Sequence, residues 1–177
     1  FVVYLDKEPA VNFNISETGQ CLAFQTYEPL ESESTEVPNY VDVSGYTKPF
    51  EARSKVGDQT QQRDLWLYHI EKDTVFKIDV SSLPGLTDLP SYTKDYPDRE
   101  WENKERGVSF SDVKFSSTDQ QAVLSMRAQD NKDRWISLLN LDTGALETLD
   151  RQHDEAWIAG PGIGSYYGGG TLGWLGD

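Results

Sequence analysis

The sequence contains two copies of one pattern, and this internal repeat limits the possible fold more than any other feature. Residues 13–24 read FNISETGQCLAF and residues 113–124 read VKFSSTDQQAVL. Aligned without a gap, the copies match at Phe13/Val113, Ile15/Phe115, Ser16/Ser116, Thr18/Thr118, Gln20/Gln120, Ala23/Val123 and Phe24/Leu124. Each copy is typical of a strand, a polar turn and a second strand, because Ser, Thr, Gly and Asp bond their own backbone in turns.

A second pair of segments repeats in the same order. Residues 63–79 read RDLWLYHIEKDTVFKID, and residues 134–150 read RWISLLNLDTGALETLD. In both, a strand runs into an acidic turn and returns as another strand. Apolar residues align at Leu65/Ile136, Leu67/Leu138, Ile70/Leu141, Val75/Leu146 and Ile78/Leu149. Each unit is therefore predicted to hold two hairpins, or four strands.

Four antiparallel strands per repeat are typical of a β-propeller blade. We expect an all-β fold, a partial β-propeller with about two four-stranded blades and the start of a third. A ring takes about four to eight blades, and open edges would expose unpaired backbone. The sequence therefore predicts a piece of a larger domain, in agreement with a first residue that is Phe rather than Met. A β-sandwich is the alternative, since any antiparallel β-protein repeats hairpins.

The repeats also predict the boundaries of one domain over residues 1–177. An insertion separates the two hairpins of the first unit, and it begins with the acidic stretch PLESESTEVP. The alternating Val and aromatic residues from Tyr40 to Val56 favour a small extra hairpin within it. The letters LGWLGD at the end resemble the opening of a further unit. Blade one is expected at about 11–80 with an insertion at 28–62, a linker at 83–107, blade two at about 108–150, and the start of the next blade at 171–177.

The linker is predicted to contain one short helix near its end, within YPDREWENKERG. Pro97 suits a first helical turn and is followed by acidic residues, while basic residues precede Gly107. Acids favour the positive end of a helix dipole, bases favour the negative end, and Gly favours a stop.

Composition excludes several classes of function. The chain has 177 residues and a net charge of -14, which fits one domain and repels nucleic-acid phosphates and anionic lipid. No apolar run approaches the ~20 residues of a membrane-spanning helix. Cys21 is the single cysteine, so a disulfide framework and a cysteine-based zinc cluster are excluded.

The motifs of catalysis and of cofactor binding are missing. No G-x-S-x-G nucleophile elbow occurs, and the Gly-rich stretch from Gly160 to Gly170 lacks the GK[ST] ending of a phosphate-binding loop, so we expect a connection between blades there. His69 is expected to be a structural strand residue. His153 lies beside Asp154 and Glu155, but no third metal ligand is marked by spacing. We predict no catalytic residue, no metal and no cofactor for this chain.

Several stretches resemble a known family. The series RAQDNKDRWISLLNLDTGALETLDRQHDEAWIAGPG, from Arg127 to Gly162, and the final LGWLGD resemble the N-terminal β-propeller of bacterial prolyl oligopeptidase-family serine peptidases, in the dipeptidyl peptidase IV-like branch. FNISETGQCLAF is similar to the blade openings of that family, which many propellers share. The resemblance spans most of the chain.

The resemblance implies a propeller that caps a C-terminal α/β-hydrolase domain with a Ser-Asp-His triad. The propeller would admit short peptides to the cavity between the domains and help to bind them, in the periplasm or outside the cell. This chain departs from the pattern because it lacks the hydrolase region and contains no Glu-Glu pair of the dipeptidyl branch. Arg127, which follows a blade strand, is the predicted substrate-binding residue.

We therefore expect the non-catalytic propeller of a serine peptidase, with a peptide substrate and the hydrolase domain as partners and no nucleic acid. A stand-alone propeller that acts as a protein-interaction module is the alternative. A glycoside-acting propeller would need a marked pair of carboxylates, which the sequence does not show.

Overall fold

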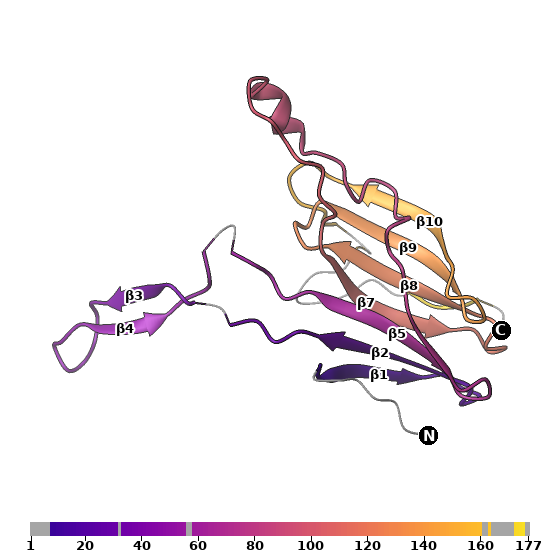
Figure 1. The fold of residues 1–177 in the computed structure, drawn as a ribbon. Helices are drawn as coiled ribbons and strands as arrows, with labels where there is room; N and C mark the ends of the chain where they lie inside the picture. Colours follow the sequence, from indigo (N-terminus) through magenta and orange to yellow (C-terminus); the bar gives the residue numbers. More distant parts are fainter. Residues whose placement is uncertain (1–7, 32, 56–57, 161–162, 164–171, 176–177) are drawn as a thin grey trace.

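The computed structural model describes residues 8–31, 33–55, 58–160, 163 and 172–175. These residues form two four-stranded antiparallel sheets and one separate hairpin (Figure 1). The first sheet has the order β1 (Ala10–Ile15), β2 (Cys21–Tyr27), β5 (Arg63–His69), β6 (Thr74–Lys77). The second has the order β10 (Leu146–His153), β9 (Asp133–Asn140), β8 (Gln121–Ala128), β7 (Val108–Phe115). β3 (Glu36–Asn39) pairs with β4 (Lys48–Glu51) in the hairpin between β2 and β5.

The internal repeat reappears in the backbone. Equivalent turns are closed by equivalent main-chain hydrogen bonds. Ser16 N donates to Cys21 O, and Ser116 N donates to Gln121 O, both at 2.9 Å. In the same way, Ile70 N donates to Gln20 O at 2.8 Å, and Leu141 N donates to Gln120 O at 3.1 Å. The aligned Gly19 and Asp119 both have positive φ, 75° and 50°. Asp tolerates this left-handed conformation better than most residues. The two units therefore have the same turn structure, as the sequence predicts.

Opposite faces of the two equivalent sheets meet in the shared core. Ala23 of β2 belongs to this core, whereas its counterpart Val123 in β8 lies on the face of the second sheet that points away from it. Conversely, Leu124 belongs to the core and its counterpart Phe24 does not. Repeated front-to-back contacts of this kind generate rings. The sheets therefore stack front to back, as the blades of a partial propeller do, rather than face to face as in a closed sandwich.

Apolar and polar contacts both join the sheets. Leu67, Leu124 and Met126 are fully buried in the core, and each such side chain contributes about 1.5–3 kcal/mol by leaving water. Two side chains of the first sheet bond the backbone of β7: the Asn14 amide donates to Val113 O at 2.6 Å, and the buried Gln25 amide donates to Phe110 O at 3.3 Å. These bonds fix β7 across the face of the first sheet.

The linker contains a short helix, as predicted, but not at the predicted place. The 3₁₀ helix η1 spans Ser91–Asp95, and residues 97–106 are not helical. That stretch has Trp101 as its one large apolar residue, so a helix there would have no apolar stripe to bury, and short helices are marginal without packing. Arg106 N also donates to Leu86 O at 3.1 Å, which draws the end of the linker back along its own beginning.

The extra hairpin of the insertion exists, but its strands flank the predicted YVDV letters rather than containing them. These letters lie in the connection because Asp42 Oδ1 accepts the Ser44 N–H at 2.7 Å and Gly45, with a φ of 75°, closes the turn. A carboxylate that bonds the backbone two residues on favours a turn over a strand.

The C-terminal predictions are only partly within the described residues. Residues 172–175 carry no strand, and Trp174 Nε1 donates to Lys114 O at 2.9 Å. The start of a further blade at 171–177 stays a prediction, and most of the Gly160–Gly170 connection lies outside the described residues. Among those described, no helix is long and apolar enough to cross a membrane.

Candidate functional site

The two ends of the sheets differ in the lengths of their connections. At one end, the short-turn end, the strands are joined by residues 16–20, 70–73, 116–120 and 141–145. The other end is the long-loop end. Because paired strands run antiparallel, the insertion at 28–62, the linker at 78–107 and the turn at 129–132 all lie there. Figure 1 shows the β3–β4 hairpin and η1 projecting from this second end. Long connections on a rigid scaffold commonly carry function.

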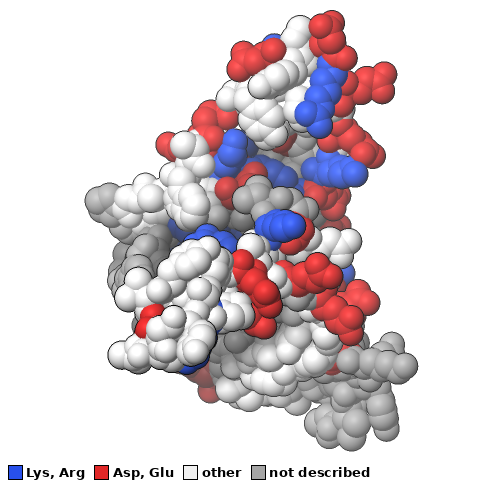
Figure 2. Space-filling view, turned by 90° about the vertical axis from the view of Figure 1, so that its left-hand side faces the viewer, with Lys and Arg blue, Asp and Glu red and all other residues white. Residues whose placement is uncertain are grey.

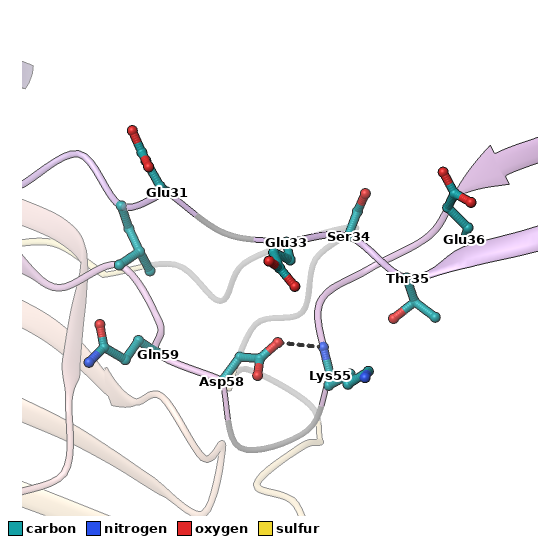
Figure 3. A pocket seen from close by; sticks show the side chains of 9 residues that line it. Glu31, Glu33, Ser34, Thr35, Glu36, Lys55, Asp58 and Gln59 are labelled. Atoms are coloured by element: carbon teal, nitrogen blue, oxygen red, sulfur yellow. Dashed lines mark hydrogen bonds between the residues drawn. The ribbon is translucent and has the colours of Figure 1, made fainter.

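An acidic cavity of about 520 Å³ lies at the neck of the insertion, where the chain leaves for the hairpin and returns from it. Figure 3 shows Glu33 and Asp58 pointing toward its middle, whereas Glu31 and Glu36 point away from it. Asp58 Oδ2 accepts the main-chain N–H of Lys55 at 2.8 Å, which holds this carboxylate in place. Apart from Glu36 at the start of β3, the lining residues lie in loops.

The lining of the acidic cavity favours a cation. Of the four acidic residues along its lining, Glu33 and Asp58 direct their carboxylates into it, and Lys55 is the one basic residue of the lining. Near a protein surface, one opposite charge at about 4 Å is worth up to about 4 kcal/mol before solvation costs. The cavity is suited to an ammonium group.

A groove of about 650 Å³ runs between the two sheets at the same end. Its floor is apolar, with Ile78, Val108 and Phe110, and its rim is charged. On the rim, Lys77 Nζ lies 2.6 Å from Asp64 Oδ2. An apolar floor with a few charged groups at the edge is the usual make-up of a ligand groove.

Gln129, which directly follows β8, ties the insertion to the second sheet beside this groove. Its Oε1 accepts Gln62 Nε2 at 2.9 Å and the Thr60 hydroxyl, and its Nε2 donates to Gln61 O at 3.1 Å. Gly107 leaves the room for this contact, because a Cβ there would lie 2.4 Å from Gln129 Oε1. The insertion, the linker and β8 therefore meet at one point.

An ionic cluster around Asp133 anchors the linker to the second sheet. The Asp133 carboxylate is fully buried. Its Oδ1 accepts Arg151 Nε at 2.7 Å and lies 3.0 Å from His153 Nδ1, and its Oδ2 lies 2.6 Å from Arg106 Nη1 in an ion pair. Arg151 also pairs with Asp88 of the linker at 2.9 Å. A cavity of about 340 Å³ opens beside this cluster.

Burial and charge act against each other at Asp133. Burial alone acts to raise the pKa of this carboxyl, but the hydrogen bond from Arg151 and the interactions with Arg106 and His153 outweigh it, so the pKa lies below its ordinary value. The group is therefore a carboxylate held by cations. Its environment is that of a structural anchor rather than of a proton donor.

Arg127, the residue predicted to bind substrate, lies away from these cavities. It sits on β8 opposite Ser109 of β7 and Arg134 of β9, on the face of the second sheet that points away from the core. It is half-buried and lines none of the three cavities at the long-loop end. The structure does not bring Arg127 together with the acids at the neck.

The two histidines occupy structural positions. His69 is buried on β5, where its Nδ1 accepts the Lys72 N–H at 3.4 Å. His153 lies between Asp133 and Glu155, whose Oε1 is 3.4 Å from His153 Nε2. Over the described ranges of the chain, no three His, Cys, Asp or Glu side chains converge to hold a metal ion.

Sequence reasoning missed the Asp133 cluster and the acidic cavity. Arg106, Asp133 and Arg151 come from the linker, β9 and β10, so no spacing marks them as a group. The acids of the neck were visible as an acidic run, but the return of the chain that sets Asp58 across from Glu33 was not. Figure 2 faces the long-loop end, with basic side chains gathered near the middle and acidic ones around them.

Comparison with known proteins bears on the fold. No family model matches the sequence, and no curated protein matches it. Two solved structures are similar, each with a TM-score of 0.51 over 82% of this chain: one assigned as a dipeptidyl aminopeptidase IV from Bacteroides ovatus, 11% identical, and dipeptidyl peptidase 4 of Porphyromonas gingivalis, 10% identical. This chain spans 18% of the length of each. At this identity the likeness shows a shared fold.

Proposed function

We propose that this chain is part of the non-catalytic propeller of a serine peptidase, and that its long-loop end helps to admit and bind short peptides. The observation that supports this best is the likeness of fold to two bacterial dipeptidyl peptidase structures over 82% of the chain. The front-to-back stacking of the two sheets is compatible with this, because successive blades of a propeller stack in the same way. Catalysis is assigned to an α/β-hydrolase domain beyond these residues.

The acidic cavity supplies the chemistry for one part of this role. A short peptide with a free amino terminus carries an ammonium group, and Glu33 and Asp58 offer carboxylates that point into the acidic cavity. The net charge of -14 also attracts cationic peptides from a distance. The neighbouring groove has an apolar floor and a charged rim, which suit side chains of the same peptide.

The test is a binding titration of the whole chain with trialanine and with N-acetyl-trialanine. We expect the free-amino peptide to bind more tightly, and Glu33→Gln or Asp58→Asn to weaken it about fivefold, as expected for one carboxylate near a partly solvated ammonium group. Glu17→Gln, the same loss of charge at the short-turn end, is the matched control. Equal binding of the acetylated peptide contradicts the proposal, as does equal loss in the control.

Arg127 remains a proposed second contact, on a different face. A guanidinium suits a carboxylate or a peptide carbonyl, so Arg127→Ala is expected to weaken binding of a peptide with a free carboxyl terminus more than of its amide. No preference between the two peptides in the unmodified chain would remove Arg127 from the site.

A further inference from the structure

His153 lies between two carboxylates that belong to different parts of the long-loop end. Its Nδ1 is 3.0 Å from Oδ1 of the buried Asp133 on β9, and its Nε2 is 3.4 Å from Oε1 of Glu155, which follows β10. The His153 side chain is 37% exposed, so it exchanges protons with water. Histidine is the side chain whose charge ordinarily changes between about pH 5 and pH 8. This contact therefore responds to pH.

Glu155 carries the contact on to the linker. Its second oxygen, Oε2, accepts the main-chain N–H of Ser91 at 3.2 Å, and Ser91 is the first residue of η1. Lys132 supports the same segment from the turn before β9, with its Nζ 5.9 Å from the centre of the Tyr92 ring. Figure 1 shows η1 projecting from the long-loop end, and all residues of η1 except Thr93 are exposed. With so little of η1 buried, its position depends on such polar contacts.

Only a protonated imidazole satisfies both carboxylates. A protonated histidine donates a hydrogen bond from each ring nitrogen, whereas a neutral one donates from a single nitrogen and carries a lone pair on the other. The neutral form must therefore turn a lone pair toward either Asp133 or Glu155. Asp133 is fully buried, so the loss of a hydrogen bond there costs more than at the Glu155 side chain, which is 55% exposed. We expect the neutral imidazole to keep its bond to Asp133 and to release Glu155.

The charged groups around His153 keep their charges over the range in which a histidine titrates. Five carboxylates face the imidazole from the linker, the turn before β9, β9 and the loop after β10: Asp88, Asp130, Asp133, Asp154 and Glu155. Three cations face it from the linker, the same turn and β10: Arg106, Lys132 and Arg151. Carboxyl groups ordinarily ionise at about pH 4, and Lys and Arg lose their proton only above about pH 10. Hydrogen bonds with Ser91 hold the pKa of Glu155 below its ordinary value. The imidazole is therefore the group whose charge changes near neutral pH.

We propose that His153 is a pH-sensitive latch that holds the η1 segment of the linker, residues 91–96, against the second sheet. At acid pH the protonated imidazole joins Asp133 to Glu155, and Glu155 holds Ser91. As the pH rises the imidazole loses its proton, Glu155 loses its partner, and the η1 segment is freed beside the cavity of about 340 Å³. The stability that the latch supplies is thus present while the histidine is protonated and is lost as the pH rises through its titration. This regulation goes beyond the peptide-binding role and does not depend on it.

The first test is hydrogen exchange of the whole chain, followed by mass spectrometry, at about pH 5.5 and at about pH 8. His153→Gln is compared with the unmodified chain at each pH, so the intrinsic pH dependence of exchange cancels. At the lower pH we expect residues 91–96 to exchange about threefold faster in His153→Gln, the effect of losing one exposed ion pair. At the higher pH we expect equal rates, because the unmodified latch is then open.

Three results would overturn the proposal. Equal rates in His153→Gln and the unmodified chain at the lower pH would show that His153 does not hold the η1 segment. An acceleration of the same size at both pH values would show that packing, and not a proton, was lost. An equal acceleration at Arg106 would show a general loosening of the linker, since Arg106 N donates to Leu86 O and its side chain pairs with Asp133 whatever the state of the histidine.

The second test removes the other half of the latch. Glu155→Gln keeps an oxygen for Ser91 but loses the charge that faces His153, so at the lower pH it should speed exchange of residues 91–96 as much as His153→Gln does. The double variant should exchange no faster than either single variant, because each breaks the same contact. Glu147→Gln, the same change at an exposed residue of β10, is the matched control and should have no effect. Effects that multiply in the double variant would show two independent contacts and overturn the latch.

Discussion

At the short-turn end the two sheets are nearly copies of each other, whereas at the long-loop end they share almost nothing. The turns at 16–20 and 116–120 have equivalent main-chain bonds and equivalent positive φ angles. The insertion and the linker, by contrast, are held by side chains from distant parts of the chain, above all Asp133 and Gln129.

The contrast shows how one scaffold serves two purposes. Short turns are fixed by the few residues inside them, so they repeat faithfully with the repeat of the sequence. Long connections have too few local bonds to fix themselves, and their loop entropy must be offset by contacts with the sheets. The functional variation of the molecule is therefore concentrated where tertiary anchors replace local ones.

The largest expected effect is at the anchor of the long-loop end. Asp133→Ala leaves Arg106 and Arg151 without their buried carboxylate, and breaking a buried ion pair costs about 3–5 kcal/mol. Asp142→Ala removes the carboxylate that pairs with Lys72 at the short-turn end, where water screens the exposed pair, so a much smaller loss is expected. Urea unfolding followed by tryptophan fluorescence measures both. Equal losses would show that the two ends are not held differently.

Acid should act on the long-loop end through the same carboxyl group. The pKa of Asp133 is lower in the folded state than in the unfolded chain, so its stabilisation is present above the unfolded value of about 3.9 and is lost as pH falls through the folded value. We expect the free energy of unfolding to fall below about pH 4, and to fall less steeply in Asp133→Asn. Parallel curves for the two proteins would contradict the assignment.

At the short-turn end, substitutions of Asp119 can distinguish the contribution of backbone conformation to stability from that of side-chain hydrogen bonds. Its carboxylate accepts the hydroxyls of Ser16 and Thr18 of the first sheet, and its φ is 50°. Asp119→Ala is expected to cost about 1–2 kcal/mol through the lost bonds. Asp119→Gly loses the same bonds but relieves the left-handed strain, so it should be about 1 kcal/mol more stable than the alanine variant. Thermal unfolding at one pH compares them, and an alanine variant as stable as the glycine variant would refute the role of strain.

A smaller effect on global stability than that at Asp119 is expected at the meeting point of the insertion and β8. Gln129→Ala removes the contacts to residues 60–62, which are largely exposed, so we expect a loss of about 1 kcal/mol or less. Hydrogen exchange should nevertheless speed up at residues 58–62 while the turn at 116–120 is unchanged. Unchanged exchange in both places would mean that Gln129 does not hold the insertion.

The sequence predicted the repeated strands and turns because their causes are local. The alternation of Leu65, Leu67 and their counterparts follows the two-residue period of a strand, and Ser16 and Ser116 mark turns that bond their own backbone. The helix over 97–106 was placed wrongly because its end signals were present without an apolar stripe to pack. Phe13 is 62% exposed whereas the aligned Val113 is 9% exposed. This difference depends on the neighbouring sheet and not on the residue itself.

By itself, the amino-acid sequence determined that the chain forms two four-stranded units with matching turns, since periodicity and turn chemistry act over a few residues. Only the tertiary structure decided that the units stack front to back, that Asp133 gathers arginines from two other segments, and that the insertion folds back to set Asp58 across from Glu33. These features depend on which distant segments meet, and the contacts that choose between alternatives exist only once the sheets have packed.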